Sequence, residues 1–489
     1  MTHLDSDQIR ALGTRVVDRI AEEFCATNRR PVFPSPQSLQ AMEELFGGSL
    51  PMEGTDPSEL LTLVLDQLLA AAGNPNHPGS MGYVLTSSMP LPALVESLVA
   101  AVKLRPTTWK NQPASCHIET TVIRWLGEMV GLSSQAAGYM TTGGSWANLA
   151  AVAVARVRKA GWDIRSEGAL GGPQLVAYAS EHTHSCVQRS CELLGIGSKW
   201  LRKIGLDSGF RLRTDLLSEA IEADIAAGLR PFLVVGNAGT VETGAIDPLT
   251  EISAIARRFG MWFHVDGAYG AFGALSDSVR PLLSGIALAD SLTVDPHKWL
   301  NTPFEAGCVL FRDWDDLRAT FSLVPTYLAG AMGLENNQYE YGFELSRTDR
   351  ALKVWLALRQ HGVRQFAELV SSHIALARYL ADLVRASDDF ELVVDPELSI
   401  CCFRFVPGGT AWGAEYLDSL NFDIEMALMR DGRGLVSGTV LNGRRVLRAC
   451  IASSSVTRQS VLETFQLLGR IGRRINSDRS KSGDSSAAS

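Results

Sequence analysis

Short apolar runs alternate with long helix-like stretches through the middle of this chain. The helix-like stretches, which begin near residue 91, are LPALVESLVAAVKL, IETTVIRWLGEMVGL and SWANLAAVAVARVRKA. The strand-like runs between and after them are LVAYAS, FLVVGNAGT, WFHVD, SLTV and GCVLFRD. Strands that alternate with helices are typical of a mostly parallel sheet covered by helices. The sequence therefore predicts an α/β fold built on a doubly wound sheet.

A chain of 489 residues is too long for one hydrophobic core, so we expect several domains. Apolar side chains at helical spacing near the start predict an amphipathic helix, and the last stretch, SDRSKSGDSSAAS, is small and polar. The expected parts are an N-terminal helical segment at 1–88, a large domain at 89–350, a small C-terminal α+β domain at 351–476 and a disordered tail at 477–489.

The composition limits the partners that this chain can have. Its formal net charge of −8 argues against a nucleic-acid partner, which usually meets a basic patch. No apolar run approaches the ~18 residues that a membrane span needs. The eight cysteines are scattered without a CxxC pair and fit reduced thiols better than a disulfide framework. We therefore expect a cytoplasmic enzyme with no secretory signal and no membrane partner.

The stretch VDPHKWL places His297 and Lys298 directly after a short apolar run. Pro296 removes a backbone donor, so the strand-like run SLTV is expected to end there. Loops at strand ends carry much of the chemistry of α/β proteins. Lys298 is therefore either a solvated surface cation or an amine with a chemical role.

A glycine-rich turn, TTGGSWANLAA, joins a strand-like run to an alanine-rich helix. Gly144 lets the backbone come close to a ligand, Ser145 can cap the helix, and the first-turn N–H groups can bind an anion. The turn lacks the Gly-Lys-Ser/Thr ending of a Walker loop and is not a GxGxxG motif. It predicts either a phosphate site or a plain helix start.

Two further strand-like runs end in polar residues. WFHVDGAYG places Asp266 at the end of a buried strand, and Gly267 and Ala268 after it leave room for a flat ligand. Asp266 could instead cap the next turn. GNAGTVETGAIDP offers Thr240 in a loop that follows another strand.

Two histidines, His182 and His184, follow the run LVAYAS. They could be metal ligands, but alternation along a strand is common and no cluster of cysteines or carboxylates completes a ligand set. We therefore expect no metal, and His184 remains available as an imidazole near the strand ends.

A lysine amine, a carboxylate at a strand end, an imidazole and a helix-start anion site would together hold pyridoxal 5′-phosphate (PLP). The amine of Lys298 would form a Schiff base with PLP, and the carboxylate would keep its pyridine nitrogen protonated. The imidazole can stack on the ring. A protonated ring is what lets PLP accept electrons, so the sequence predicts this cofactor.

These stretches resemble the group II PLP-dependent amino-acid decarboxylases, the family of aromatic-L-amino-acid, tyrosine, histidine and glutamate decarboxylases. DPHKW resembles the family's cofactor-lysine motif, HVDGAY its pyridine-nitrogen motif, EHTHSCVQRS its stacking-histidine segment and TTGGSWANLAA its phosphate loop. The resemblance runs from about Asn74 to Ser453. It implies the aspartate aminotransferase-like fold of PLP-dependent transferases (fold type I), and a homodimer with shared active sites in which the N-terminal segment serves dimerisation.

The resemblance assigns roles around the cofactor ring. Lys298 would be the Schiff-base lysine and Asp266 the partner of the ring nitrogen. Ala268 would lie against one face of the ring, and His184 would stack on the other.

The resemblance also implies which residues hold the rest of the cofactor. The phosphate would be bound by Gly144, Ser145, His297 and Asp295. Asp295 stands where many relatives have Asn. Val241 stands where aromatic decarboxylases usually carry a hydroxyl residue, and Thr240 would take that place beside the cofactor.

The segment VPTYLAG resembles the family's mobile catalytic loop, in which Tyr327 would be the proton donor. The residues after it are rich in Gly, Ala and Asn without clear periodicity, as in long functional loops. The alternative is a surface tyrosine in a connecting segment. Aldehyde-forming relatives carry Phe at this place. Pocket positions for the substrate are matched by Tyr83, Thr86, Arg105 and Arg448.

The activity implied is decarboxylation of an L-amino acid, aromatic by default, to the amine and CO2. Val84 and Leu85 stand where the animal aromatic enzymes have Phe-Pro, and Arg105 could favour an acidic or small polar substrate or be solvated. The alternatives are an aminotransferase-type or aldehyde-forming enzyme of the same fold, and a scaffold that has no activity and binds a partner.

Overall fold

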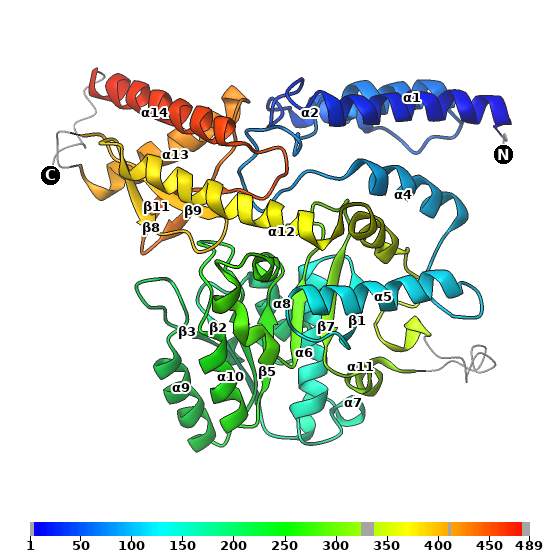
Figure 1. Ribbon diagram of the computed structural model, residues 1–489, viewed down its shortest axis with the longest axis vertical. Coiled ribbons are helices and arrows are strands. Elements are labelled where there is room, and N and C mark those ends of the chain that lie inside the picture. Colours follow the sequence, from blue (N-terminus) through cyan, green and yellow to red (C-terminus); the bar gives the residue numbers. More distant parts are fainter. Residues whose placement is uncertain (1–3, 324–336, 409–411, 482–489) are drawn as a thin grey trace. The chain divides into compact units, whose positions relative to one another are not determined.

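The computed structural model of the protein describes residues 4–323, 337–408 and 412–481 (Figure 1). The chain forms two compact units. The sheet unit comprises Leu91–Ala375 and Pro396–Ile400, and the terminal unit comprises Met1–Pro90, Leu376–Asp395 and Cys401–Ser489. None of the helices in the described ranges is long and apolar enough to cross a lipid bilayer.

A seven-stranded sheet forms the centre of the sheet unit, in the order β1-β7-β6-β5-β4-β2-β3. Its strands are β1 (Ala137–Thr141), β2 (Leu175–Ser180), β3 (Leu201–Ile204), β4 (Arg230–Asn237), β5 (Trp262–Asp266), β6 (Ser291–Val294) and β7 (Gly307–Phe311). β7 is antiparallel to both of its neighbours, and the other pairs are parallel. The mostly parallel sheet predicted from the sequence is confirmed.

Helices cover both faces of this sheet. The helices of the sheet unit are α4 (Pro90–Val102), α5 (Pro113–Met129), α6 (Gly144–Lys159), α7 (Ile164–Glu167), α8 (Ser185–Leu193), α9 (Thr214–Ala226), α10 (Leu249–Arg258), α11 (Trp314–Phe321) and the first part of α12 (Arg350–Arg385). Val235 of β4 packs into the core that α6 and α8 share, whereas Gly236 faces Leu249 of α10. Successive strand residues point to opposite faces, so both faces of β4 are covered.

Burial on both faces explains why these strands read as unbroken apolar runs in the sequence. Every residue of β1, β2, β5, β6 and β7 is buried. The helix α6 contributes small buried side chains, which let it lie close to the sheet; they are Ala147, Ala150, Ala151 and Ala155.

The terminal unit is built on a second sheet of four strands, in the order β10-β11-β9-β8. Its strands are β8 (Phe390–Val394), β9 (Ile400–Phe405), β10 (Ser437–Leu441) and β11 (Arg444–Cys450). Its helices are α1 (Ser6–Cys25), α2 (Leu39–Phe46), α3 (Pro57–Leu63), the π-helix η1 (Val64–Leu68), α13 (Ala414–Asp431), α14 (Arg458–Lys481) and the end of α12. α13 packs against β11 and α14.

The N-terminal segment belongs to the terminal unit because its backbone pairs with the second sheet. Met81 N–H donates to Leu435 O at 3.0 Å, and Cys450 N–H donates to Met81 O at 2.7 Å. The structure therefore divides the chain differently from the boundaries expected at 88/89 and 350/351. The first 90 residues share a unit with the C-terminal sheet, and α12 contributes to both units.

One helix departs from the sequence prediction, and another is interrupted. α14 continues to Lys481, so residues 477–481 are helical although the stretch from Ser477 was expected to be disordered. α12 is interrupted at Gly362, whose φ of 70° is a conformation that glycine adopts readily.

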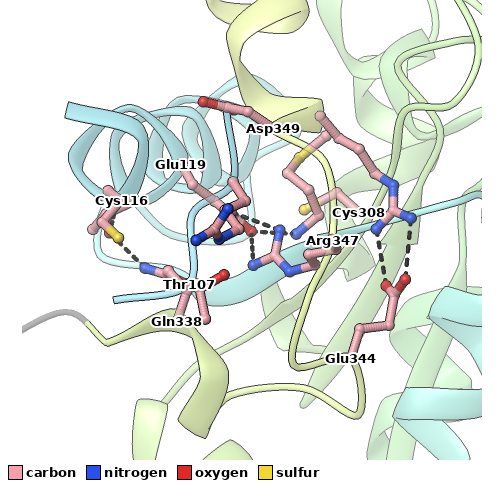
Figure 2. A network of polar contacts seen from close by, with 12 residues as sticks. Thr107, Cys116, Glu119, Cys308, Gln338, Glu344, Arg347 and Asp349 are labelled. Carbon is pink, nitrogen blue, oxygen red and sulfur yellow. Dashed lines mark hydrogen bonds and ion pairs between the residues drawn. The ribbon is translucent and has the colours of Figure 1, made fainter. Parts of the chain in front are cut away.

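A buried ion pair joins α5 to β1 and to the segment before α12 (Figure 2). Arg347 donates to both carboxylate oxygens of Glu119, at 2.7 and 2.8 Å, and Met140 N–H donates to the same carboxylate at 2.8 Å. The side chains of Arg347 and Glu119 are 3% and 0% exposed. Because Met140 lies one residue before the end of β1, this pair holds the strand end from which the glycine-rich turn starts.

Replacing Arg347 with Met should destabilise the protein strongly, because Glu119 would keep an uncompensated buried charge. We expect the free energy of unfolding to fall by about 3–5 kcal/mol in urea denaturation. Arg10→Met is the control, since it breaks an exposed pair with Asp7 and should cost less than about 0.5 kcal/mol. Equal losses in the two variants would contradict the role given to the buried pair.

Candidate active site

Four strands end at one edge of the first sheet. The last residue of β5, Asp266, pairs with the last residue of β4, Asn237. The last residues of β6 and β1 pair with the first two residues of β7. The segments that follow these strands therefore meet at this edge, which is where ligands bind in open α/β sheets.

Lys298 lies on the segment after β6 and forms an ion pair with Asp295. Its Nζ is 3.0 Å from Asp295 Oδ2, and its side chain is 26% exposed. Burial lowers the pKa of Lys298, but the carboxylates of Asp295 and Asp266 raise it, and the net pKa is above its usual value. Lys298 is thus a partly accessible amine held between two carboxylates.

Asp266 is buried and accepts one hydrogen bond on each carboxylate oxygen. Ala268 N–H donates to Oδ1 and Asn148 Nδ2 donates to Oδ2, each at 3.1 Å. Burial raises the pKa of Asp266, while Lys298 and the Ala268 N–H lower it; the net pKa is raised. A cationic group placed beside this carboxylate would favour its ionised form.

The start of α6 lies very close to the segments that follow β5 and β6. A Cβ on Gly144 would lie 2.9 Å from both Ala268 Cβ and Asp295 Oδ2. A Cβ on Gly143 would lie 3.2 Å from His297 Cε1. The first of these distances is too short for any side chain, so glycine is needed for the approach. The helix start thus forms a cradle lined by these segments.

Ser145 does not cap α6, contrary to the sequence prediction. The N-cap position needs a non-helical backbone, and Gly143 occupies it, so Ser145 lies inside the first turn. In the described structure no side chain caps this helix. Its first-turn N–H groups, that of Ser145 among them, are therefore available to an anion.

Two of the predicted histidines lie at this edge, each with its Nδ1 bound to the backbone. His184 is the N-cap of α8 and accepts a hydrogen bond from Cys186 N–H at 3.3 Å. His297 accepts one from Ala306 N–H at 3.1 Å. Partial burial lowers the pKa of His184, the charge of Asp266 raises it, and the net pKa is lowered. His184 is therefore a neutral imidazole, close enough to Asp266 to respond to its charge.

His182 is engaged elsewhere. Its ring stacks on Phe210, with ring centroids 5.6 Å apart. Across the described ranges, no group of three or more His, Cys, Asp and Glu side chains is placed to hold a metal ion.

Three other predicted residues are placed as follows. Thr240 is buried in the loop after β4, and its hydroxyl is 3.0 Å from that of Thr243. Arg105 is exposed, and its backbone N–H donates to Gln112 Oε1 at 2.6 Å. Tyr327 lies outside the described residues.

The remaining predicted substrate residues, Tyr83, Thr86 and Arg448, belong to the terminal unit. Arg448 Nη1 donates to Tyr83 O and to Ser437 Oγ, both at 3.1 Å. Tyr83 has a φ of 56°, a backbone conformation that non-glycine residues rarely adopt. The hydrogen bond from Arg448 to its carbonyl supports this conformation. The roles of these residues toward a substrate stay predictions.

Sequence reasoning missed Asn148 and His264. Asn148 follows Gly144 by four residues and is the polar member of the buried, alanine-rich face of α6. His264 precedes Asp266 by two residues, so both point to the same face of β5. These two spacings are the signal that could have identified them.

This set of groups fits PLP. Lys298 offers the amine, Asp266 the carboxylate for a ring nitrogen, and His184 an imidazole for stacking. The Gly144 cradle, which a Cβ would fill, brings the anion site of α6 to the same edge. The residues that the sequence singled out for the cofactor ring and phosphate thus belong to segments that meet at one place.

Comparisons with known proteins agree with this assignment. Residues 55–406 match the model of the pyridoxal-dependent decarboxylase conserved domain. The chain is 32% identical over 476 residues to an aromatic-L-amino-acid decarboxylase of Bacillus atrophaeus, with 97% of each covered. It is 30% identical to a phenylacetaldehyde synthase of Arabidopsis thaliana, with 95% of this chain and 96% of that protein covered. The crystal structure of Oryza sativa TDC with PLP and tryptamine has a TM-score of 0.90 at 27% identity, covering 97% of this chain and 99% of that one.

The chain belongs to the pyridoxal-dependent decarboxylase family. It is a PLP-dependent amino-acid decarboxylase, a carboxy-lyase with the type I fold of PLP enzymes. The resemblance, the fold class and the cofactor predicted from the sequence are confirmed.

Asp266→Asn should leave the fold intact and slow decarboxylation, because a neutral amide does not stabilise a proton on a ring nitrogen as a carboxylate does. A charge partner of this kind shifts a pKa by about 1–3 units, so we expect kcat to fall by ~10- to 10³-fold in an assay of CO2 release. The control is Asp290→Asn at the opposite end of β5, where the carboxylate binds Phe263 N–H. Near-normal turnover of Asp266→Asn would place the ring nitrogen elsewhere.

Proposed function

We propose that this enzyme converts an aromatic L-amino acid to the corresponding amine and CO2. The observation that carries the proposal is the similarity, over 97% of the chain, to a protein named for that activity. The arrangement of Lys298 and Asp266 at one sheet edge supports the chemistry, and the substrate class rests on the similarity.

PLP, when bound, accepts the electrons left on the α-carbon as CO2 leaves. Lys298 binds the cofactor covalently. Asp266 holds a proton at the pyridine nitrogen, because opposite charge stabilises the protonated form. Tyr327 would deliver a proton to the α-carbon, and the amine of Lys298 would then displace the product amine from the cofactor.

Other residues hold the cofactor in place. His184 would stack on one face of the ring and Ala268 would lie against the other. Thr240 would lie beside the cofactor. The phosphate is bound by first-turn N–H groups of α6 and by neighbouring side chains, namely Gly144, Ser145, His297 and Asp295.

The substrate is bound by Tyr83, Thr86, Arg105 and Arg448. Arg105 also supports a second candidate, an acidic or small polar amino acid, because an exposed guanidinium can bind a side-chain carboxylate. The aromatic substrate is preferred because it agrees with the names of the similar proteins.

We propose a homodimer with shared active sites. Support comes from apolar side chains that each unit leaves exposed. The helices α1, α2 and α3 of the terminal unit contain no buried residue, and Leu39 is 86% exposed. In the sheet unit, Leu98 and Val102 of α4 are each 62% exposed. Exposed apolar surface of this kind is typical of subunit interfaces. In the proposed dimer, a second copy of this chain covers it.

We propose a cytoplasmic location. Seven of the eight cysteines are buried and Cys25 is exposed, and their scattered positions fit reduced thiols in a reducing compartment.

A panel of L-amino acids, assayed for CO2 release, tests the substrate class. Tryptophan, tyrosine and phenylalanine should exceed glutamate and aspartate in kcat/KM by at least ~10-fold, the discrimination that a pocket fitted to one side-chain class supplies. Arg105→Gln should change kcat/KM for the three aromatic substrates by about the same factor and leave their preference over glutamate and aspartate in place. A preference for glutamate or aspartate that disappears in Arg105→Gln would establish the second candidate instead.

Tyr327→Phe separates cofactor binding from the fate of the substrate carbon. The variant should still bind PLP and release CO2, but without the phenolic proton the electron-rich carbon becomes open to oxygen. We expect a shift from amine toward aldehyde, ammonia and hydrogen peroxide, with CO2 released in both cases, measured under air against the same reaction without oxygen. Amine formation at the wild-type rate would show that Tyr327 is not the proton donor.

A further inference from the structure

A chain of hydrogen-bonded side chains lies behind Asp266, within the core of the sheet unit. Trp262 Nε1, Ser291 Oγ, His264 and Asn148 Oδ1 follow one another in this chain, each contact being 2.8 Å long. The amide nitrogen of Asn148 then reaches Asp266 Oδ2 at 3.1 Å and Gly144 O at 2.9 Å. Asn148, His264 and Ser291 are each at most 1% exposed.

The direction of every hydrogen bond in this chain is determined by its two ends. Gly144 O can only accept, so the atom of Asn148 facing it is the amide nitrogen, and the amide oxygen faces His264. His264 must then donate from Nε2. Complete burial lowers the pKa of His264 to about 3, so the ring is neutral and its Nδ1 accepts from Ser291.

The other end of the chain agrees with this assignment. Trp262 Nε1 can only donate, and it donates to Ser291 Oγ, which leaves the single hydroxyl proton of Ser291 for His264. All donors therefore point one way, from Trp262 to the carboxylate of Asp266. Turning the Asn148 amide over would place its oxygen against Gly144 O and the carboxylate of Asp266, neither of which donates, and leaving such buried groups unpaired costs about 1–3 kcal/mol.

The last member of the chain connects the two halves of the cofactor site. Asn148 is on α6, whose first turn forms the phosphate cradle, and it binds the carbonyl of Gly144 in that turn. The same amide group binds Asp266 at the end of β5. Its orientation is set by His264, so the position of the carboxylate and that of the cradle are linked through one side chain.

We propose that Asn148 and His264 are positioning residues that hold the carboxylate of Asp266 toward the pyridine nitrogen of PLP. Asn148 donates a hydrogen bond that fixes Oδ2 and stabilises the charge, and His264 fixes the orientation of Asn148. The inference rests on the role proposed for Asp266 toward the ring nitrogen.

The test compares PLP with 1-deazapyridoxal 5′-phosphate, in which a carbon replaces the ring nitrogen. Full-length protein freed of cofactor is titrated with each compound, and binding is followed by tryptophan fluorescence. A hydrogen bond to a charged group contributes about 1.5 kcal/mol or more, so Asn148→Ala should bind PLP ~10-fold more weakly than the wild type. Its affinity for the deaza compound should stay within about twofold of the wild-type value, since that compound gains nothing from the carboxylate.

His264 supplies the second pair of variants. His264→Leu removes the donor and should weaken PLP binding several-fold without changing affinity for the deaza compound. His264→Gln can donate to Asn148 and accept from Ser291, so it should recover most of the loss. If Asn148→Ala does not fold, the two His264 variants are sufficient to test the inference.

Asn421 offers a matched control in the terminal unit. It is a buried helical asparagine whose amide donates to the carbonyl four residues before it, at 2.9 Å, as Asn148 does, and to Phe405 O. Asn421→Ala should lose stability and keep the wild-type preference for PLP over the deaza compound.

Three outcomes would overturn the inference. Equal weakening of both compounds in Asn148→Ala or His264→Leu would show a purely structural role. An unchanged preference for PLP in these variants would show that Asp266 acts without them. Equal binding of both compounds by the wild type would instead refute the role of Asp266 itself, so the two failures are distinguishable.

Discussion

β5 is paired on both edges and buried on both faces, and the position of its last residue determines the geometry of the site. Asp266 cannot shift without breaking the backbone hydrogen bonds to β4 and β6. Ala268, two residues on, is in turn pressed against Gly144, where a Cβ would not fit. The carboxylate and the helix start are therefore held together by the sheet, and the lysine segment after β6 joins them at the same edge.

Two buried polar networks support this edge from behind. Glu119 and Arg347 hold the end of β1, from which the glycine-rich turn leaves. Asn148 and His264 hold the other side, where α6 meets β5. The members of both networks are almost entirely buried, so each must find its partners within the protein. Such networks favour one arrangement over its alternatives, because a misplaced member leaves a buried group unsatisfied.

Much of the fold follows from local sequence pattern, and the rest depends on contacts between distant segments. β2, β5 and β6 have the bounds expected from LVAYAS, WFHVD and SLTV, because strands buried on both faces appear as uninterrupted apolar runs. The N-terminal segment could not be placed, since its backbone bonds run from Met81 to Leu435 and Cys450, more than 350 residues away. The cap of α6 was also misassigned, because the choice between Gly143 and Ser145 depends on backbone angles.

The residues of the site also divide into those that local sequence pattern predicts and those that depend on contacts between distant segments. Lys298 and Asp266 could be predicted because each follows a strand-like run, and parallel strands end at one edge. Asn148 was missed: its spacing from Gly144 marks a polar residue on a buried helix face, but its role depends on a histidine of β5, and nothing in GSWANLAA indicates that partner. Arg105, an expected pocket residue, is exposed, which agrees with the alternative that its side chain is solvated.

The central claim is that Lys298 carries the cofactor at this edge. Reduction of the enzyme with borohydride makes the bond between lysine and PLP permanent, and peptide mass spectrometry then locates the label. The account predicts a phosphopyridoxyl group on the peptide that contains Lys298, with Lys298→Ala unlabelled. A label on a different lysine, such as Lys203 or Lys353, or full labelling of Lys298→Ala, would contradict it.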